Sequence, residues 1–191
     1  MKKLALAIMI GSLAVATSAS ASNWYVQGDL GYSKLKTDDL SKSRFSPSFA
    51  VGYKLNDWRF ALDYSHYGKL EDTHVEQSYS QRFSAKGQGL GFSAIYDIKI
   101  NSDLKPYVGA RLSVNKAKID KYEVATNQGI TTAKSSSESD YATGIGAVAG
   151  VQYSFTPKWA LNGGVEYNYL GKFDDTKVKQ YGAKVGIRYN F

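Results

Sequence analysis

The last stretch of the chain, residues 179–191, reads KQYGAKVGIRYNF and ends in a regular alternation of two kinds of residue. From position 181 to Phe191 every second residue is apolar, and the residues between them are polar, charged or glycine. A period of two is that of a β-strand with two unlike faces. Lys184 and Arg188 lie on the polar face, so this strand separates an apolar environment from a polar one.

The same alternation recurs in the stretches 23–33, 45–55, 58–67, 90–98, 104–115, 141–155 and 159–169. None of the apolar faces carries an Asp, Glu, Lys or Arg, although 21% of the chain is charged. A surface that faces water has no reason to exclude charge so completely, whereas a surface that faces lipid does. The pattern therefore predicts a barrel whose outer wall contacts membrane lipid.

Charged residues gather instead on the opposite faces, near the middle of the strands. We predict that they form a charge network in the lumen, made of Asp29, Arg59, Asp63, Arg111, Glu166, Lys184 and Arg188. A soluble barrel has the reverse polarity, with apolar residues inside. The network could line a selective pore, or it could fill the lumen with structural salt bridges. The filling is favoured because a barrel of this size encloses only enough space for side chains.

Polar connections between the strands alternate in length along the chain. Long ones cover about 34–44, 68–81, 116–139 and 171–178, and short turns join the other strand pairs. Outer-membrane barrels place long loops outside the cell and short turns in the periplasm. We therefore predict four extracellular loops in the long ranges and both chain ends on the periplasmic side.

Aromatic residues gather at both ends of the predicted strands, as the interfacial girdles of a membrane barrel do. One set lies toward the short turns and the other toward the long loops: Trp24, Trp58, Tyr96, Phe155, Trp159 and Phe191 in the first, and Tyr32, Phe45, Tyr64, Tyr141, Tyr169 and Tyr181 in the second. The fold predicted from these patterns is all-β, an eight-stranded antiparallel transmembrane β-barrel of the outer-membrane type formed by residues 22–191.

The N-terminal segment 1–21 has the features of a cleaved signal peptide. Two lysines precede the apolar run 4–16, and Ala19-Ser20-Ala21 is an A-x-A cleavage site. The run is shorter than the roughly 20 residues that a membrane-spanning helix needs. We therefore predict export and insertion into the bacterial outer membrane, with outer-membrane lipid as the partner of the barrel wall.

The composition and motifs of the chain argue against several kinds of functional site. The chain has no cysteine, which excludes disulfides and thiolate sites. The net charge of +7 falls to +5 without Lys2 and Lys3, and this scattered surplus does not indicate a nucleic-acid partner. The glycine patterns at 87–91 and 144–146 open no helix, so they do not predict a phosphate loop. No catalytic, cofactor-binding or metal-binding residues are predicted.

The strand sequences resemble a known family. The segments NWYVQGDLGYS, FSPSFAVGYKLNDWRFALDYSHY, KPYVGAR, GAVAGVQYSFTPKWALNGGVEYNYLG and GAKVGIRYNF, in this order, resemble the opacity family porins. The resemblance covers nearly all of the chain after position 21 and weakens in the loops. It implies an eight-stranded outer-membrane barrel, and the best-known members are adhesins that bind host receptors through variable loops. Because the loops do not match, it implies no particular receptor.

The C-terminal pair Tyr189 and Phe191 resembles the signal that the barrel-assembly machinery of the outer membrane recognises. This resemblance makes that machinery an expected partner during folding. It also predicts that the final strand is important for insertion.

Adhesion or host-surface recognition is the leading function predicted from the sequence, with a host-surface receptor or glycan as the possible partner. The candidate binding residues are apolar and aromatic groups of the two longest loops, namely Leu70, Val75, Tyr79, Tyr122, Val124 and Ile130. The same side chains could instead only pack the loops together. The alternative function is a small pore for passive diffusion. A lipid-modifying enzyme that uses His66 with Asp72 or Ser65 is a more distant one.

Overall fold

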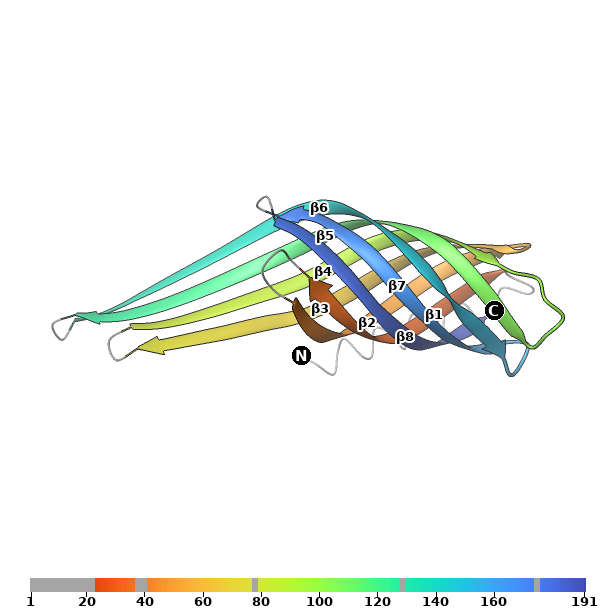
Figure 1. Cartoon of the computed structure of the whole chain (residues 1–191), viewed down its shortest axis with the longest axis horizontal. Coiled ribbons are helices and arrows are strands. Elements are labelled where there is room, and N and C mark those ends of the chain that lie inside the picture. Colours follow the sequence, from red (N-terminus) through yellow and green to blue (C-terminus); the bar gives the residue numbers. More distant parts are fainter. Residues whose placement is uncertain (1–22, 37–40, 77–78, 128–129, 174–175) are drawn as a thin grey trace.

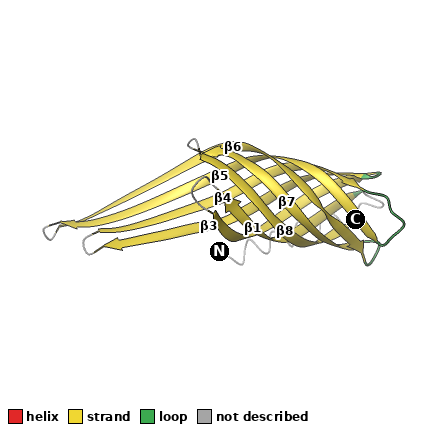
Figure 2. Ribbon diagram, viewed as in Figure 1, coloured by secondary structure: helices red, strands yellow, loops and turns green. Residues whose placement is uncertain are grey.

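The computed structural model describes residues 23–36, 41–76, 79–127, 130–173 and 176–191 as a barrel of β-strands (Figures 1 and 2). The predicted signal peptide, 1–21, lies outside the described residues. The strands are β1 (Trp24–Lys36), β2 (Ser41–Leu55), β3 (Trp58–Glu76), β4 (Tyr79–Asp97), β5 (Leu104–Asn127), β6 (Ile130–Ser154), β7 (Trp159–Phe173) and β8 (Thr176–Asn190). None of the described residues forms a helix long and apolar enough to cross a membrane.

Each strand pairs antiparallel with the next, and β8 pairs with β1 to close the barrel. The closing register runs from Tyr25 opposite Asn190 to Lys36 opposite Lys179. In addition, the backbone N–H of Phe191 donates to the carbonyl of Trp24 at 3.1 Å. The predicted fold class, an eight-stranded antiparallel barrel, is confirmed.

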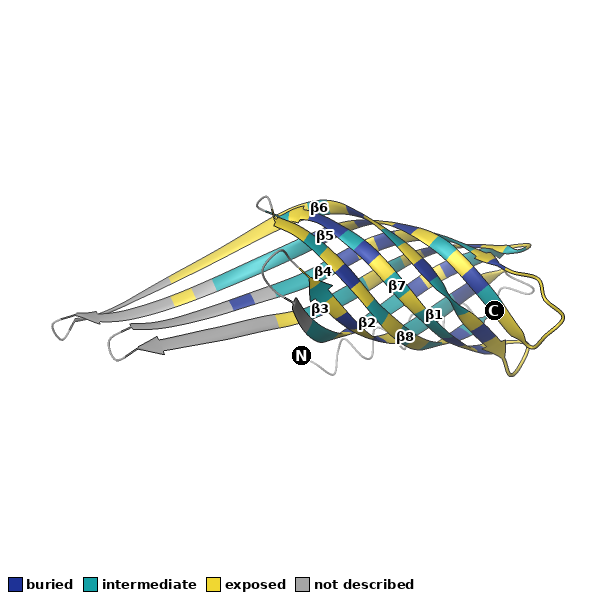
Figure 3. Cartoon of the chain, in the orientation of Figure 1, coloured by how far each residue is buried: buried dark blue, intermediate teal, exposed yellow. Residues whose placement is uncertain are grey.

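Buried and exposed residues alternate along the barrel wall (Figure 3). The exposed positions carry large apolar side chains such as Leu62, Leu90 and Val185. The buried positions carry polar and charged side chains, including Arg59 and Arg111, together with lumen tyrosines. Since apolar groups cover the outside and polar groups fill the inside, the wall has the polarity of a barrel that stands in lipid.

Tight connections close one end of the barrel. Asn56, in the hairpin between β2 and β3, has a φ of 55°, a left-handed conformation that asparagine tolerates better than most residues. Residues 98–103 connect β4 to β5, and 155–158 connect β6 to β7. We call this end of the barrel the short-turn end.

At the other end, β3 to β6 continue far beyond the barrel, which corrects the prediction of loops at 68–81 and 116–139. β3 pairs with β4 up to Glu76 opposite Tyr79, and β5 pairs with β6 up to Asn127 opposite Ile130. β4 and β5 remain paired over the same length. These strands form the long projection at the left of Figure 1, which we call the four-stranded extension and define as residues 69–76, 79–86, 118–127 and 130–139.

The other two predicted loops, 34–44 and 171–178, are also mainly strand. β1 reaches Lys36 and β2 begins at Ser41, while β7 reaches Phe173 and β8 begins at Thr176. Outside the membrane both faces of a strand meet water, so the apolar alternation disappears from the sequence. The backbone still needs hydrogen-bond partners there, and the neighbouring strand supplies them.

Two register shifts interrupt the pairing of strands toward the end of the barrel that is opposite the short turns. One lies in β3 between His66 and Lys69 and contains Gly68 with a φ of 86°. The other lies in β7 between Tyr169 and Gly171, and Gly171 has a φ of 113°. Left-handed glycines are typical of β-bulges, which bend a strand and increase its twist.

Candidate functional site

The barrel lumen contains a hydrogen-bonded network centred on Arg111, which β5 directs inward. Arg111 Nη2 lies 2.6 Å from Asp63 Oδ2, and Nε donates to both carboxylate oxygens at 3.0 and 3.1 Å. Nη1 donates to the Tyr67 hydroxyl at 3.1 Å, and that hydroxyl donates to Asn115 Oδ1 at 3.0 Å. Asn115 in turn donates to the carbonyl of Leu170 at 2.8 Å, so the network connects β3, β5 and β7.

A second group lies between β7 and β8. Lys184 Nζ is 3.3 Å from Glu166 Oε2, and Gln180 donates to Glu166 Oε1 at 2.7 Å. Asn168 donates to Gln180 at 2.6 Å. The lysine and the glutamate, both expected in the lumen, are therefore brought together, and two amides complete the group.

Arg59 pairs with Asp97, a partner that the sequence analysis did not name. Arg59 Nη2 lies 2.7 Å from Asp97 Oδ1, and the arginine is only 1% exposed. The Arg59 guanidinium also lies 4.9 Å from the centre of the Tyr107 ring. Asp97 follows Tyr96 at the end of β4, where alternation alone directs it inward, but it lies outside the mid-strand region in which charges were sought.

Two other predicted members of the lumen network have different surroundings. Asp29 accepts hydrogen bonds from Gln27 at 2.9 and 3.0 Å and has no cation at ion-pair distance among the described residues. Arg188 lies with its guanidinium 5.0 Å from the centre of the Tyr25 ring. The predicted charges therefore form separate groups rather than one continuous network.

Little space remains between these side chains. The free volume in the middle of the lumen is about 40 Å³, and its lining includes Asp29, Asp63, Arg111, Glu166 and Lys184. Such a volume holds only a few water molecules. The lumen is thus occupied mainly by side chains, as expected for a barrel of eight strands.

The predicted lumen network named only charged residues and therefore left out three large tyrosines of the lumen. Tyr25, Tyr67 and Tyr107 are almost completely buried inside the barrel. Glycines on neighbouring strands make room for them, since a Cβ at Gly52 would collide with the Tyr25 ring and one at Gly89 would lie 2.5 Å from the Tyr67 hydroxyl. The sequence signal that could have revealed these lumen tyrosines is an inward-facing tyrosine on one strand with an inward-facing glycine on a neighbouring strand.

The four-stranded extension holds all of the predicted partner-binding residues. Its strands continue the barrel register, so each position belongs to the face that continues either the lipid side or the lumen side of the wall. Val75, Tyr122 and Val124 occupy positions of the first face, and Leu70, Tyr79 and Ile130 occupy positions of the second. Tyr122 is 48% exposed, while the other five side chains lie outside the described residues. The six positions are therefore divided between the two faces of the extension.

The extension has its own polar contacts on β5 and β6. Lys118 Nζ lies 3.3 Å from Asp120 Oδ1, and the Ser137 hydroxyl donates to the same carboxylate at 2.8 Å. This hydrogen bond, with the neighbouring lysine, lowers the pKa of the Asp120 carboxyl. The carboxylate is thus fully charged at neutral pH.

The possible dyad with His66 receives no support from the geometry on β3. The Ser65 hydroxyl donates to Asp63 at 3.1 Å and is thereby part of the lumen network. The side chain of Asp72 lies outside the described residues.

At the short-turn end, the residues of the predicted assembly signal belong to an aromatic cluster. The ring centres of Tyr189 and Trp159 are 4.8 Å apart, and those of Tyr189 and Phe191 are 5.1 Å apart, both in edge-to-face arrangements. Such contacts stabilise aromatic pairs beyond their buried area. The last strand is therefore fixed by its rings as well as by its backbone.

Comparisons with known proteins agree with this architecture. Residues 51–191 match the family described as Opacity family porin protein. Protein opa of Haemophilus influenzae is 45% identical over 74% of this chain and all of its own length, and an opacity protein of Neisseria gonorrhoeae is 32% identical over 76% of this chain and 78% of its own. The crystal structure of Neisserial surface protein A is 33% identical, with a TM-score of 0.67 over 91% of this chain and 100% of its own.

The family match covers the end of β2 and all of β3 to β8, and the match to Neisserial surface protein A covers 91% of the chain. The barrel has an outer face of apolar residues and a lumen of polar ones. The wall lies in the bacterial outer membrane. The chain therefore belongs to the opacity family of porin proteins.

Proposed function

We propose that this outer-membrane protein recognises a host-surface protein or glycan through its four-stranded extension. One observation carries the proposal: in the described part of the chain, the extension is the feature that projects well beyond the barrel (Figure 1). The barrel wall is committed to lipid, and side chains occupy the lumen. A partner outside the cell therefore meets the extension first.

The groups available on the extension suit a specific contact better than attraction by bulk charge. Over the four segments of the extension, six basic residues stand against six acidic ones. Nearly balanced charge gives little steering toward a polyanion. Exposed aromatic residues such as Tyr122 are often hot spots, the residues that contribute most of the binding energy at protein interfaces. We expect binding to depend on these aromatic and apolar groups.

The alternative, a diffusion pore, depends on the lumen. Its free volume of about 40 Å³ and its buried ion pairs favour a filled interior over a solute path. The conductance of the purified protein in planar lipid bilayers tests this alternative directly. A steady conductance combined with a lack of binding would make the pore the better account.

A binding experiment tests the main proposal with register-matched deletions. Lys69 pairs with Lys86 and Lys118 pairs with Ser139, so two-residue Asn-Gly turns can replace 70–85 and 119–138 without changing the barrel register. The parent and each shortened protein are screened against host cells, host-surface proteins and glycans. We expect the parent to bind and at least one shortened form to lose binding.

Point variants test whether individual side chains of the extension are needed for binding. Tyr79→Ser with Tyr122→Ser should abolish adhesion while the heat-modifiable barrel stays intact. Tyr153→Ser is the matched control, because this exposed tyrosine lies at the short-turn end of β6. Adhesion that survives the double change, or a parent protein that never adheres, contradicts the proposal.

We also propose that the barrel-assembly machinery recognises the C-terminal strand through Tyr189 and Phe191. Support comes from their place in the aromatic cluster, next to the seam between β1 and β8 that closes the barrel. No catalytic role is proposed for this chain.

A further inference from the structure

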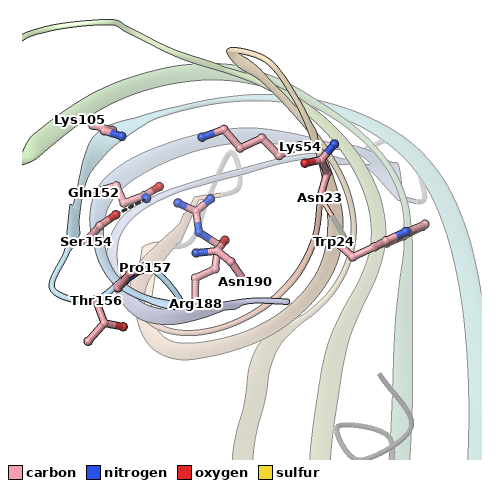
Figure 4. A pocket seen from close by; sticks show the side chains of 10 residues that line it. All are labelled: Asn23, Trp24, Lys54, Lys105, Gln152, Ser154, Thr156, Pro157, Arg188 and Asn190. Atoms are coloured by element: carbon pink, nitrogen blue, oxygen red, sulfur yellow. Dashed lines mark hydrogen bonds between the residues drawn. The ribbon is translucent and has the colours of Figure 1, made fainter. Parts of the chain in front are cut away.

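A cavity of about 340 Å³ opens at the short-turn end of the barrel, opposite the four-stranded extension. Its lining comes from β1, β2, β5, β6, β8 and the turn at 155–158, and it includes Asn23, Lys54, Lys105, Gln152, Arg188 and Asn190 (Figure 4). In an outer-membrane barrel the short turns face the periplasm. The cavity is therefore open to periplasmic solutes and far from any partner outside the cell.

The cavity is lined by three cations and, among its described lining residues, by no carboxylate. In Figure 4 the Arg188 guanidinium lies inside the ring of strands, the Lys54 side chain extends into the ring, and Lys105 lies at its edge, the rim of the cavity. Asp97 lies beside the cavity, and Arg59 Nη2 is 2.7 Å from its Oδ1. Lys54 is 3.9 Å from Asp97, at the limit of an ion pair. Arg59 and Lys54 share this carboxylate, while Lys105 and Arg188 have no ion-pair partner among the described residues.

Arg188 is the least compensated of these groups. It is 2% exposed, and its Nε has no hydrogen-bond partner. No described carboxylate pairs with it, and its guanidinium contacts the face of the Tyr25 ring. A buried cation without a counter-charge is costly, and an anion in the cavity would remove that cost.

We propose that this cavity binds a phosphate-type oxyanion. A guanidinium donates to two oxygens of such a group at once, and lysines add compact charge from other directions. The side-chain amides of Asn23 and Asn190 can donate further hydrogen bonds from the cavity wall. The volume accommodates a phosphate together with several waters.

The phosphate group can come from two sources that share this chemistry. One is free inorganic phosphate in the periplasm, and the other is the headgroup of an anionic phospholipid in the inner leaflet of the outer membrane. Arg188 and Lys105 would contact the phosphate oxygens in either case. The experiment therefore uses one probe for each source.

The test uses the full-length mature barrel, refolded in a phosphate-free maltoside detergent. Inorganic phosphate and, separately, short-chain phosphatidylglycerol are titrated at constant ionic strength, with chloride as the reference anion. Binding is measured by calorimetry and by broadening of the ³¹P resonance. We expect saturable binding of at least one probe and none of chloride.

Three variants distinguish a specific phosphate-binding site from nonspecific attraction of anions to positive charge. Lys105→Gln changes an exposed residue at the rim and should weaken binding about tenfold, since it removes one charge-assisted contact. Arg188→Gln should abolish binding, provided that heat-modifiability shows a folded barrel. Lys99→Gln is the matched control, because this exposed lysine lies at the same end but pairs with Asp57 at 3.0 Å outside the cavity.

Each outcome decides the matter. Saturable binding of either probe that Lys105→Gln weakens and Lys99→Gln leaves unchanged supports the site and identifies the source of the phosphate. Two results overturn it: the absence of saturable binding of both probes, or an equal loss in the Lys105 and Lys99 variants. Because the extension takes no part, neither result affects the proposed adhesion.

Discussion

Replacing Arg111 with alanine tests whether the lumen is held by specific ion pairs. The change removes three hydrogen bonds to the Asp63 carboxylate and one to the Tyr67 hydroxyl. It leaves a carboxylate whose side chain is 13% exposed inside the barrel. Breaking a buried pair in this way typically costs about 3–5 kcal/mol.

The structure sets the expected value within that range. Asp63 keeps hydrogen bonds from Ser65 at 3.1 Å and Ser93 at 3.5 Å after Arg111 is lost. The space that the guanidinium vacates adds to a lumen volume that already holds a few waters, so water can solvate the carboxylate. We therefore expect a loss of ~3 kcal/mol in the free energy of unfolding, at the lower end for a buried pair.

A double-mutant cycle distinguishes the pair from its separate parts. Asp63→Ala leaves the guanidinium of Arg111, which is 4% exposed, with the neutral Tyr67 hydroxyl as its remaining hydrogen-bond partner among the described residues, and should cost at least as much. The double variant should cost less than the sum by ~2–3 kcal/mol, a coupling typical of residues in one network. The assay is urea unfolding in phospholipid bilayers, followed by tryptophan fluorescence and by electrophoretic mobility without heating.

A control pair lies on the extension. Lys118→Ala and Asp120→Ala break a solvent-exposed pair and should leave unfolding unchanged within experimental error. Additive effects of the Arg111 and Asp63 variants, within ~0.5 kcal/mol, would refute the reasoning, because independent sites behave in that way.

Two further predictions concern the wall and the C-terminus. Gly91→Ala should destabilise the barrel by ~1–3 kcal/mol in the same assay, because its methyl group would overlap the Arg111 guanidinium, whereas Gly28→Ala, with nothing within 4 Å of the added carbon, should have no measurable effect. Equal effects of the two changes would contradict this account. Phe191→Ser should lower the amount of heat-modifiable folded protein in the outer membrane without reducing export, as measured by cell fractionation; unchanged folded levels would show that the terminal aromatic is dispensable.

The membrane-embedded part of the fold could be predicted from the sequence because lipid and lumen impose opposite demands on successive residues. Leu112 and Arg111 are neighbours in β5, yet one is exposed on the outer wall and the other is buried in the lumen. The alternation of apolar and polar residues in the sequence, with a period of two, reflects that difference directly. The alternation ends at Lys116, because Lys116, Lys118 and Asp120 place charges at the positions of β5 that continue the lipid side. The strand was therefore predicted as a loop although it pairs with β6 as far as Asn127.

The charged lumen could be predicted only in part, because alternation gives the direction of a side chain but not its partner. Arg111 and Asp63 lie 48 positions apart in the chain, and they meet because Arg111 pairs with Ser93 and Asp63 pairs with Gly91 on the strand between them. Partnership thus depends on barrel register, which the sequence pattern leaves undetermined. Arg59 could not be assigned to Asp97 for the same reason.

The unbroken ladder between β5 and β6 has a mechanical consequence. It runs from Leu104 opposite Tyr153, in the wall, to Asn127 opposite Ile130, at the far end of the extension. Hydrogen bonds between antiparallel strands lie across the strands. A pull at the tip along the strands is carried by the covalent backbones of both strands, which the ladder already holds extended, whereas a slack loop would stretch before it transmitted force. Tension on a bound partner would therefore pass along this hairpin directly into the part of the barrel that is embedded in lipid.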